Sequence, residues 1–214
     1  MITQLLYVEG KDYFFIGQLC KMKFPTPKGF TENSAKQFMK GGSGYPEILD
    51  RFLTGLDTPN LTNIGLIVDA DFGNIEGRFS SILAALSQKL KRDLSKYRLN
   101  TEGVTIVEEG LPTIGIWLMP DNTQDGYLEY FVEQLIPNDD VILPLAKSAV
   151  ADLMTKDYCK FTEVKQQKAI IYNWLAWQQS PGLPFGTALE AGFLSAEKAS
   201  LQPFLNWIGR SFQF

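Results

Sequence analysis

The sequence predicts an α/β fold, a mainly parallel sheet flanked by helices, with a helical C-terminal extension. Short and nearly continuous apolar runs at 2–8, 63–68 and 113–119 alternate with helical patterns. This arrangement is typical of parallel sheets that are covered on both faces. Beyond about residue 140 the apolar residues recur only at helical spacing. We therefore expect an α/β domain over 1–140 and a helical extension over 141–214 that packs on it.

The spacing of apolar residues predicts the individual elements. We expect strands over 2–8, 63–68, 104–107 and 113–119, and helices from Asp12 and over 76–98, 125–136, 144–157, 163–178, 188–196 and 203–212. Thr187 and Glu190 fit a capping box at the start of the 188–196 helix. Two stretches, KFPTPKGF (23–30) and GGSGYP (41–46), are expected to be loops, because proline and glycine disfavour regular structure.

Composition limits the class of protein. The chain has 214 residues, of which 45% are hydrophobic, so it can build a substantial core. It has no apolar run of about 18 residues, and its N-terminus lacks a basic start and a cleavage site, so we expect no membrane span and no signal peptide. Cys20 and Cys159 are too few for a disulfide framework or a zinc cluster, which favours a reducing cytoplasm.

The absence of histidine limits the chemistry. None of the 214 residues is a histidine, which excludes Ser-His-Asp and Cys-His catalysis and histidine zinc ligands. Carboxylates, lysines, hydroxyls or a bound cation must carry any reaction. The net charge of −4 argues against a broad nucleic-acid-binding surface but permits a local basic patch.

Acidic residues follow the predicted strands. Glu9 follows the first, Asp69 and Asp71 follow the second within LIVDADFGN (66–74), and Asp121 follows the strand at 113–119. The carboxyl ends of neighbouring parallel strands meet at one edge of a sheet. Carboxylates gathered there repel one another unless a cation neutralises them, and oxygen ligands select Mg²⁺ or Mn²⁺. The sequence therefore predicts a divalent-cation site.

The motifs also carry a resemblance. Val8-Glu9-Gly10-Lys11-Asp12, followed later by Val68-Asp69-Ala70-Asp71, resembles the Toprim domain, the metal-binding module of topoisomerases, primases and overcoming-lysogenization-defect nucleases. More closely, the whole chain resembles a bacterial and archaeal family of Toprim-like proteins of unknown function. That likeness lies in GIWLMPDN (115–122), KAIIYNWLAWQQSPGLPFGTAL (168–189) and FLNWIGRSF (204–212).

The resemblance implies a Toprim-like, Rossmann-like fold and a set of residue roles. Glu9 would act as general acid or base in phosphodiester chemistry, and Asp69 and Asp71 would hold Mg²⁺ or Mn²⁺. Asp121 or Glu129 would serve a second metal, as further acids do in overcoming-lysogenization-defect nucleases. The implied activity is metal-dependent cleavage or nicking of DNA or RNA.

Other functions stay open. The protein could be a non-catalytic, metal-binding regulatory or binding partner, for example of an ATPase, and the acidic net charge favours that alternative. A phosphatase of the haloacid-dehalogenase type also uses Asp-x-Asp, but it needs Thr or Val where this chain has Gly73. Response-regulator receivers are about half as long.

Two groups of residues are candidates for nucleic-acid contact. The basic residues at the end of the 76–98 helix are interpreted as a solvated helix face; they are Lys89, Lys91, Arg92, Lys96 and Arg98. Aromatic side chains can serve as base-stacking platforms. The helical spacing of Trp174, Trp177 and Trp207 beside apolar residues predicts instead that all three lie in the core.

Overall fold

The structure is a computed structural model that describes residues 3–10, 13–24 and 39–212. Lys11, Asp12 and most of the loop predicted over 23–30 lie outside the described residues. In chain order the elements are β1 (Thr3–Glu9), α1 (Tyr13–Lys23), β2 (Met39–Gly42), α3 (Tyr45–Gly55), β3 (Leu61–Asp69), α4 (Ile75–Leu90), β4 (Val104–Ile106), β5 (Thr113–Met119), α5 (Leu128–Gln134), α6 (Ile142–Met154), η1 (Glu163–Lys165), α7 (Gln166–Ala176), α8 (Phe185–Glu190), η2 (Ala199–Leu201) and α9 (Gln202–Phe212).

The described strands form one five-stranded sheet in the order β2-β1-β3-β5-β4. All neighbouring pairs are parallel except β4 and β5. Val8 of β1 pairs with Ile67 of β3, and Asp69 of β3 pairs with Met119 of β5. The predicted α/β fold with a mainly parallel sheet is confirmed, and β1, β3 and β5 end at the same edge.

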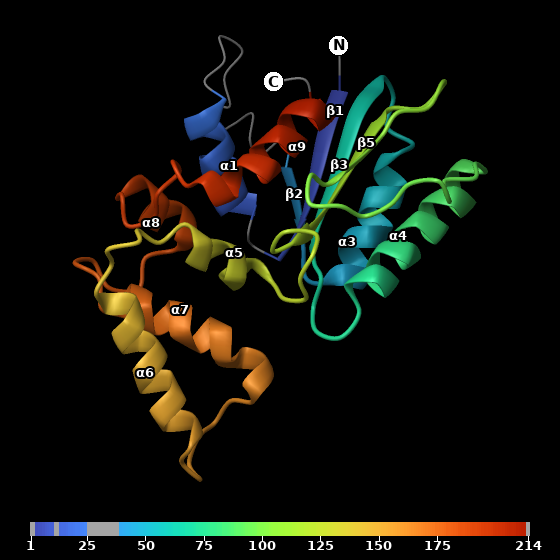
Figure 1. Ribbon diagram of the computed structural model, residues 1–214. Coiled ribbons are helices and arrows are strands. Elements are labelled where there is room, and N and C mark those ends of the chain that lie inside the picture. Colours follow the sequence, from blue (N-terminus) through green and yellow to red (C-terminus); the bar gives the residue numbers. More distant parts are fainter. Residues whose placement is uncertain (1–2, 11–12, 25–38, 213–214) are drawn as a thin grey trace.

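Helices cover both faces of the sheet (Figure 1), with α3 and α4 on one face and α1, α5 and α9 on the other. Side chains alternate along each strand, so successive residues enter different layers of the core. Leu66 and Val68 of β3 belong to the cluster under α3 and α4, whereas Ile67 lies in the cluster on the opposite face. Burial on both faces explains why these strands are almost continuously apolar.

The C-terminal helices take two different positions. The pair α6 and α7 projects away from the sheet, whereas α9 returns to lie across it (Figure 1). Trp207 Nε1 of α9 donates a hydrogen bond to the carbonyl of Val104 at 3.1 Å, and Asn63 Nδ2 of β3 donates to the carbonyl of Ser211 at 2.7 Å. The last helix of the chain is therefore part of the sheet's covering layer.

The prediction that GGSGYP is a loop is wrong. Gly41 and Gly42 belong to β2, which pairs with β1, and α3 begins three residues later at Tyr45 with a proline in its first turn. A short edge strand that ends in two glycines has no apolar run to reveal it. Proline early in a helix satisfies the local geometry, because its missing N–H would have had no partner there.

The predicted capping box is also wrong. The helix α8 begins at Phe185, before Thr187, and ends at Glu190, and no side chain caps its start. Pro184 occupies the N-cap position, and its fixed φ lies close to a helical value. The helix expected over 188–196 is therefore shorter and begins earlier.

The predicted helix over 76–98 ends early, at Leu90. Lys91 adopts a left-handed conformation, with φ 53°, which terminates the helix. Lys96 lies beyond that end and pairs with Glu108 at 2.6 Å. The five basic residues therefore do not share one helix face.

The prediction for the tryptophans is confirmed for two of the three. Trp174 and Trp207 are fully buried, whereas Trp177, the C-cap of α7, is 46% exposed. The difference coincides with the end of the helix, since Trp174 lies inside α7 and Trp177 follows its last residue. In the part of the chain that the structure describes, no helix is long and apolar enough to cross a membrane.

Candidate site at the carboxyl edge of the sheet

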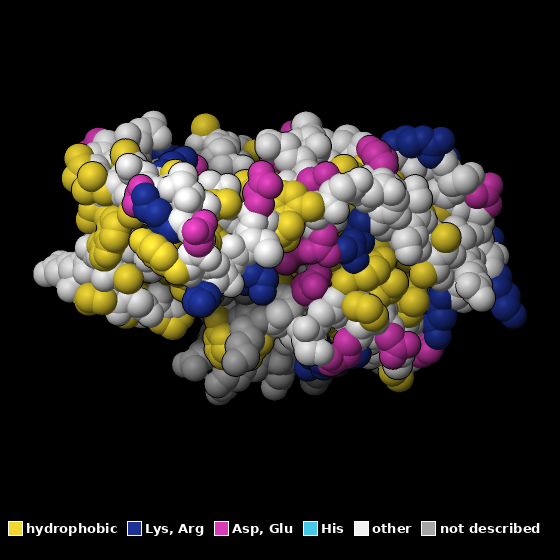
Figure 2. All heavy atoms as spheres, turned by 90° about the horizontal axis from the view of Figure 1, so that it is seen from below, with side chains coloured by type: hydrophobic (Ala, Val, Ile, Leu, Met, Phe, Trp, Pro, Cys, Tyr) yellow, Lys and Arg dark blue, Asp and Glu magenta, His cyan; other side chains and the backbone are white. Residues whose placement is uncertain are grey.

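Glu9 and Asp69 end neighbouring strands. Glu9 is the last residue of β1 and Asp69 the last residue of β3. The backbone N–H of Asp69 donates to Glu9 Oε2 at 3.1 Å, and Asp69 Oδ1 accepts from the backbone N–H of Leu128 at 3.1 Å. Figure 2, which views the molecule from below, shows acidic side chains near the middle of this face with basic and hydrophobic side chains beside them.

Asp71 is held in place by a second loop. Its backbone N–H donates to the carbonyl of Gly126 at 2.8 Å, and the N–H of Gly126 donates to the carbonyl of Asp71 at 2.8 Å. Asp71 has φ 59°, a left-handed conformation that aspartate tolerates better than most residues. Its side chain is 58% exposed, and its carboxylate forms an ion pair with Arg78 of α4.

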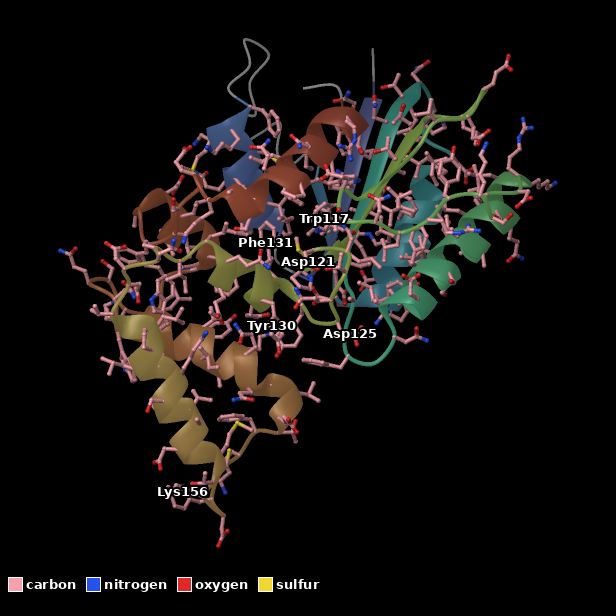
Figure 3. All side chains as sticks on the ribbon, in the orientation of Figure 1. Trp117, Asp121, Asp125, Tyr130, Phe131 and Lys156 are labelled. Atoms are coloured by element: carbon pink, nitrogen blue, oxygen red, sulfur yellow. The ribbon has the colours of Figure 1, made fainter. Side chains whose placement is uncertain are left out.

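Asp125 supports this loop, and sequence reasoning missed it. Its carboxylate accepts from the backbone N–H groups of Gly73 at 2.8 Å and of Ile75 at 3.0 Å. Figure 3 shows Asp125 at the lower end of the sheet, with Tyr130 of α5 nearby. The loops after β3 and β5 are thus fastened together, although the bonded residues are about 50 positions apart.

Arg78 is the second residue that sequence reasoning missed. Its guanidinium lies 3.9 Å from the centroid of the Tyr45 ring, a cation–π contact that restricts its orientation. A pocket of ≈ 290 Å³ opens beside it, and its lining residues are Tyr45, Ala70, Asp71, Phe72, Asn74, Arg78 and Ser81. The one local signal was an arginine in the first turn of the helix that follows the acids.

The surroundings raise the pKa of Glu9 above its ordinary value. Burial of the carboxyl group is the main cause, and the negative charge of Asp71 acts in the same direction. The hydrogen bond from Asp69 and the positive charge of Arg78 oppose the shift without cancelling it. A carboxyl group with a raised pKa is suited to proton transfer near neutral pH.

The two further acids have structural partners. Asp121 Oδ1 accepts from the backbone N–H groups of Thr123 at 2.9 Å and Gln124 at 3.0 Å, so it caps the turn after β5. Glu129 of α5 is buried, and its carboxylate pairs with Lys168 of α7 at 3.1 Å.

The oxygen atoms of these acids are suitable ligands for a hard cation, but the acids are not grouped as a metal site in the present arrangement. Within the described residues, no three acids or cysteines are grouped so that they could hold a metal ion. Asp69 and Asp71 offer the oxygen ligands that Mg²⁺ and Mn²⁺ prefer. In the present arrangement Arg78 supplies the positive charge beside Asp71, so a cation bound there would take its place.

The fold and this edge define a Rossmann-like α/β protein with its acidic residues at the carboxyl ends of parallel strands. The comparisons with known proteins add a family. The chain matches the model of a family described as "Protein of unknown function (DUF3226)" over residues 3–213, and it belongs to that family. No curated protein and no solved structure matches the chain.

Proposed function

We propose that this protein cleaves phosphodiester bonds of DNA or RNA with the help of Mg²⁺ or Mn²⁺. The observation that carries the proposal is the position of Glu9, whose pKa is raised and whose carboxylate accepts a hydrogen bond from Asp69. Asp71 and Arg78 lie close enough to influence its charge. The resemblance of the acidic motifs to Toprim enzymes supports the same chemistry.

Each residue has a proposed role in hydrolysis. Asp69 and Asp71 would hold the cation, which when bound lowers the pKa of the attacking water and neutralises the scissile phosphate. Glu9 would accept a proton from the attacking water as the water oxygen bonds to phosphorus, and the departing ester oxygen would take a proton from solvent water as the P–O bond breaks. Arg78 offers a guanidinium to the negative charge on the phosphate.

A second candidate function is that of a non-catalytic binding or regulatory partner, for example of an ATPase. The ion pair between Arg78 and Asp71 favours it, because this pair neutralises one acid of the site without a metal. In both cases we propose a reducing cytoplasmic setting, in keeping with the unpaired thiols of Cys20 and Cys159.

Cation binding is the first test. Mg²⁺ or Mn²⁺ should raise the melting temperature, because a ligand that binds only the folded state stabilises it, by about 2.7 kcal/mol at a hundredfold excess over Kd. The double substitution Asp69→Asn and Asp71→Asn should abolish this shift. Asp152→Asn is the control, since it removes an exposed acid of α6 that pairs with Lys156. A shift that survives in the double variant would rule out the proposed ligands.

Cleavage is the second test and separates the two candidates. Glu9→Gln should keep most of the thermal shift and lose cleavage of supercoiled plasmid and of single strands in Mn²⁺, because its proposed role is proton transfer. Cleavage that continues unchanged in Glu9→Gln would come from a contaminant. A thermal shift without cleavage, with or without a candidate ATPase, would favour the binding partner.

A further inference from the structure

The proposed chemistry leaves one wall of the pocket beside Asp71 unexplained. Phe72 follows Asp71 directly, lines the pocket and is 45% exposed. Its ring makes edge contacts with Tyr127 and Tyr130, at centroid distances of 5.6 and 6.2 Å. Tyr127 is itself fixed, because its hydroxyl donates to the carbonyl of Val164 at 2.6 Å. Phe72 is therefore an exposed ring with a supported position.

The same pocket carries a cation held in a defined orientation. The guanidinium of Arg78 lies on the Tyr45 ring and pairs with Asp71, and its side chain is only 17% exposed. Asn74 and Ser81 add polar groups to the lining. An aromatic ring, a guanidinium and polar groups around one small space are the elements that bind a nucleobase and a phosphate.

We propose that this pocket binds one unpaired nucleotide of a single-stranded nucleic acid, with its base stacked on Phe72 and a phosphate on Arg78. The inference rests on the proposed function and names the substrate class of that site. Since Phe72 is next to Asp71 in the chain, a base on its ring brings the neighbouring phosphates toward the acids.

Size and charge both favour a single strand over a duplex. The volume of ≈ 290 Å³ is near the lower end of small-molecule sites, which suits one nucleotide. In a duplex the faces of each base are covered by its neighbours, so a base must leave the stack before an aromatic ring can receive it. Duplex binding through phosphates alone needs many positive charges, and this chain has a net charge of −4.

The test measures binding, so that it does not depend on cleavage. Fluorescence anisotropy in Mn²⁺ would use the Glu9→Gln protein with labelled strands of about 12 nucleotides, within the site size of single-strand binders. The probes are oligothymidylate, oligouridylate, an abasic strand with the same phosphates, and a hairpin duplex. The thymine strand should bind roughly 5- to 150-fold more tightly than the abasic strand, the range given by stacking of one base.

Variants assign the contacts. Phe72→Ala should remove the advantage of the thymine strand and leave the affinity for the abasic strand unchanged, and Phe72→Tyr should restore that advantage. Arg78→Gln should lower the affinity for the thymine strand and for the abasic strand to a similar degree, because both strands carry the phosphates. Trp177→Ala is the matched control, since that ring is 46% exposed and belongs to the end of α7. It should change neither affinity.

Several results would overturn the inference. They are no measurable binding of the thymine strand, an equal loss of affinity for the thymine and abasic strands in Phe72→Ala, or duplex binding as tight as single-strand binding. Base-dependent binding through Phe72 together with no cleavage by the wild-type protein would support the pocket and overturn the proposed reaction. Cleavage that depends on Glu9 but is unchanged in Phe72→Ala would support the proposed reaction and overturn the pocket. A preference between the thymine and uracil strands would support the pocket and show that it distinguishes the 5-methyl group of the base or the 2′-hydroxyl of the sugar.

Discussion

At the scale of single residues, the partner of a carboxylate decides its role. Glu9 and Glu129 both have carboxyl groups in partly apolar surroundings. Glu9 accepts from a backbone N–H and has a raised pKa, whereas Glu129 is 4% exposed and paired with Lys168. The first carboxylate has the raised pKa on which the proposed proton transfer depends, and the second joins α5 to α7.

Lys168→Met should therefore destabilise the protein by about 1–3 kcal/mol, because it leaves the buried carboxylate of Glu129 without its ammonium partner. The value is below that of a fully buried pair, since Lys168 is half exposed. Urea unfolding measures the loss, and adding Glu129→Gln should restore much of it. Lys156→Met is the control, because that lysine pairs with the exposed Asp152 and such pairs contribute about 0–1 kcal/mol. Equal losses in the two lysine variants would contradict this account of Glu129.

At the scale of elements, α9 packs on the sheet at a point where β3 and β5 each have a glycine. A Cβ at Gly115 of β5 would approach Ser211 Oγ to 2.7 Å, and a Cβ at Gly65 of β3 would approach the Phe212 ring to 2.8 Å. Trp207 packs against Trp117 of β5, which Figure 3 shows between the sheet and α9. The glycines therefore set how closely the last helix approaches the strands that carry the site.

Gly115→Ala should cost about 1–3 kcal/mol of unfolding free energy, because the added methyl group overpacks this contact. Gly209→Ala provides the control on α9 itself. Its Cβ would meet its nearest neighbour only at 4.0 Å, and alanine is about 1 kcal/mol better than glycine inside a helix. Denaturant unfolding should therefore show opposite signs for the two variants. A Gly115→Ala protein as stable as the wild type would mean that the approach of α9 to the sheet does not depend on this glycine.

At the scale of the whole molecule, the helices expected to form the C-terminal extension pack in two different ways. One buried cluster joins β1, β5, α1 and the later helices, and Phe204, Trp207 and Ile208 of α9 belong to it. By contrast, α6 contributes only Ala146 and Val150 as buried residues among its 13. Local stability follows burial, so α6 and α9 should differ.

Hydrogen exchange followed by mass spectrometry should show this difference. Amides of α6 should exchange well before those of β1, β3 and β5, and amides of α9 should exchange together with the sheet. The comparison of α6 with α9 is internal, because both lie within 141–214. If α9 exchanged at the rate of α6, burial in the common core would not govern the stability of α9, and this account would fail.

The sequence by itself predicted the class of fold and the strand ends at which the acids lie. The strand Thr113–Met119 was predicted at its exact bounds, because an almost continuous apolar run stands between Pro112 and Pro120. Glu9 and Asp69 were predicted to follow strands, and they are the final residues of β1 and β3. A strand that is buried on both faces needs apolar residues at nearly every position, so it can be recognised from consecutive residues alone.

Only the tertiary structure decided which side chains meet at that edge. Arg78 with Asp71 and Tyr45, and Asp125 with Gly73, are contacts between loops and helices whose own sequences carry no mark of the partner. The four-residue strand β2 and the docking of α9 on Gly65 and Gly115 also depend on distant segments. The physical reason is that hydrophobic periodicity reports how each segment is buried, whereas hydrogen bonds, ion pairs and close packing depend on which segments the completed fold brings together.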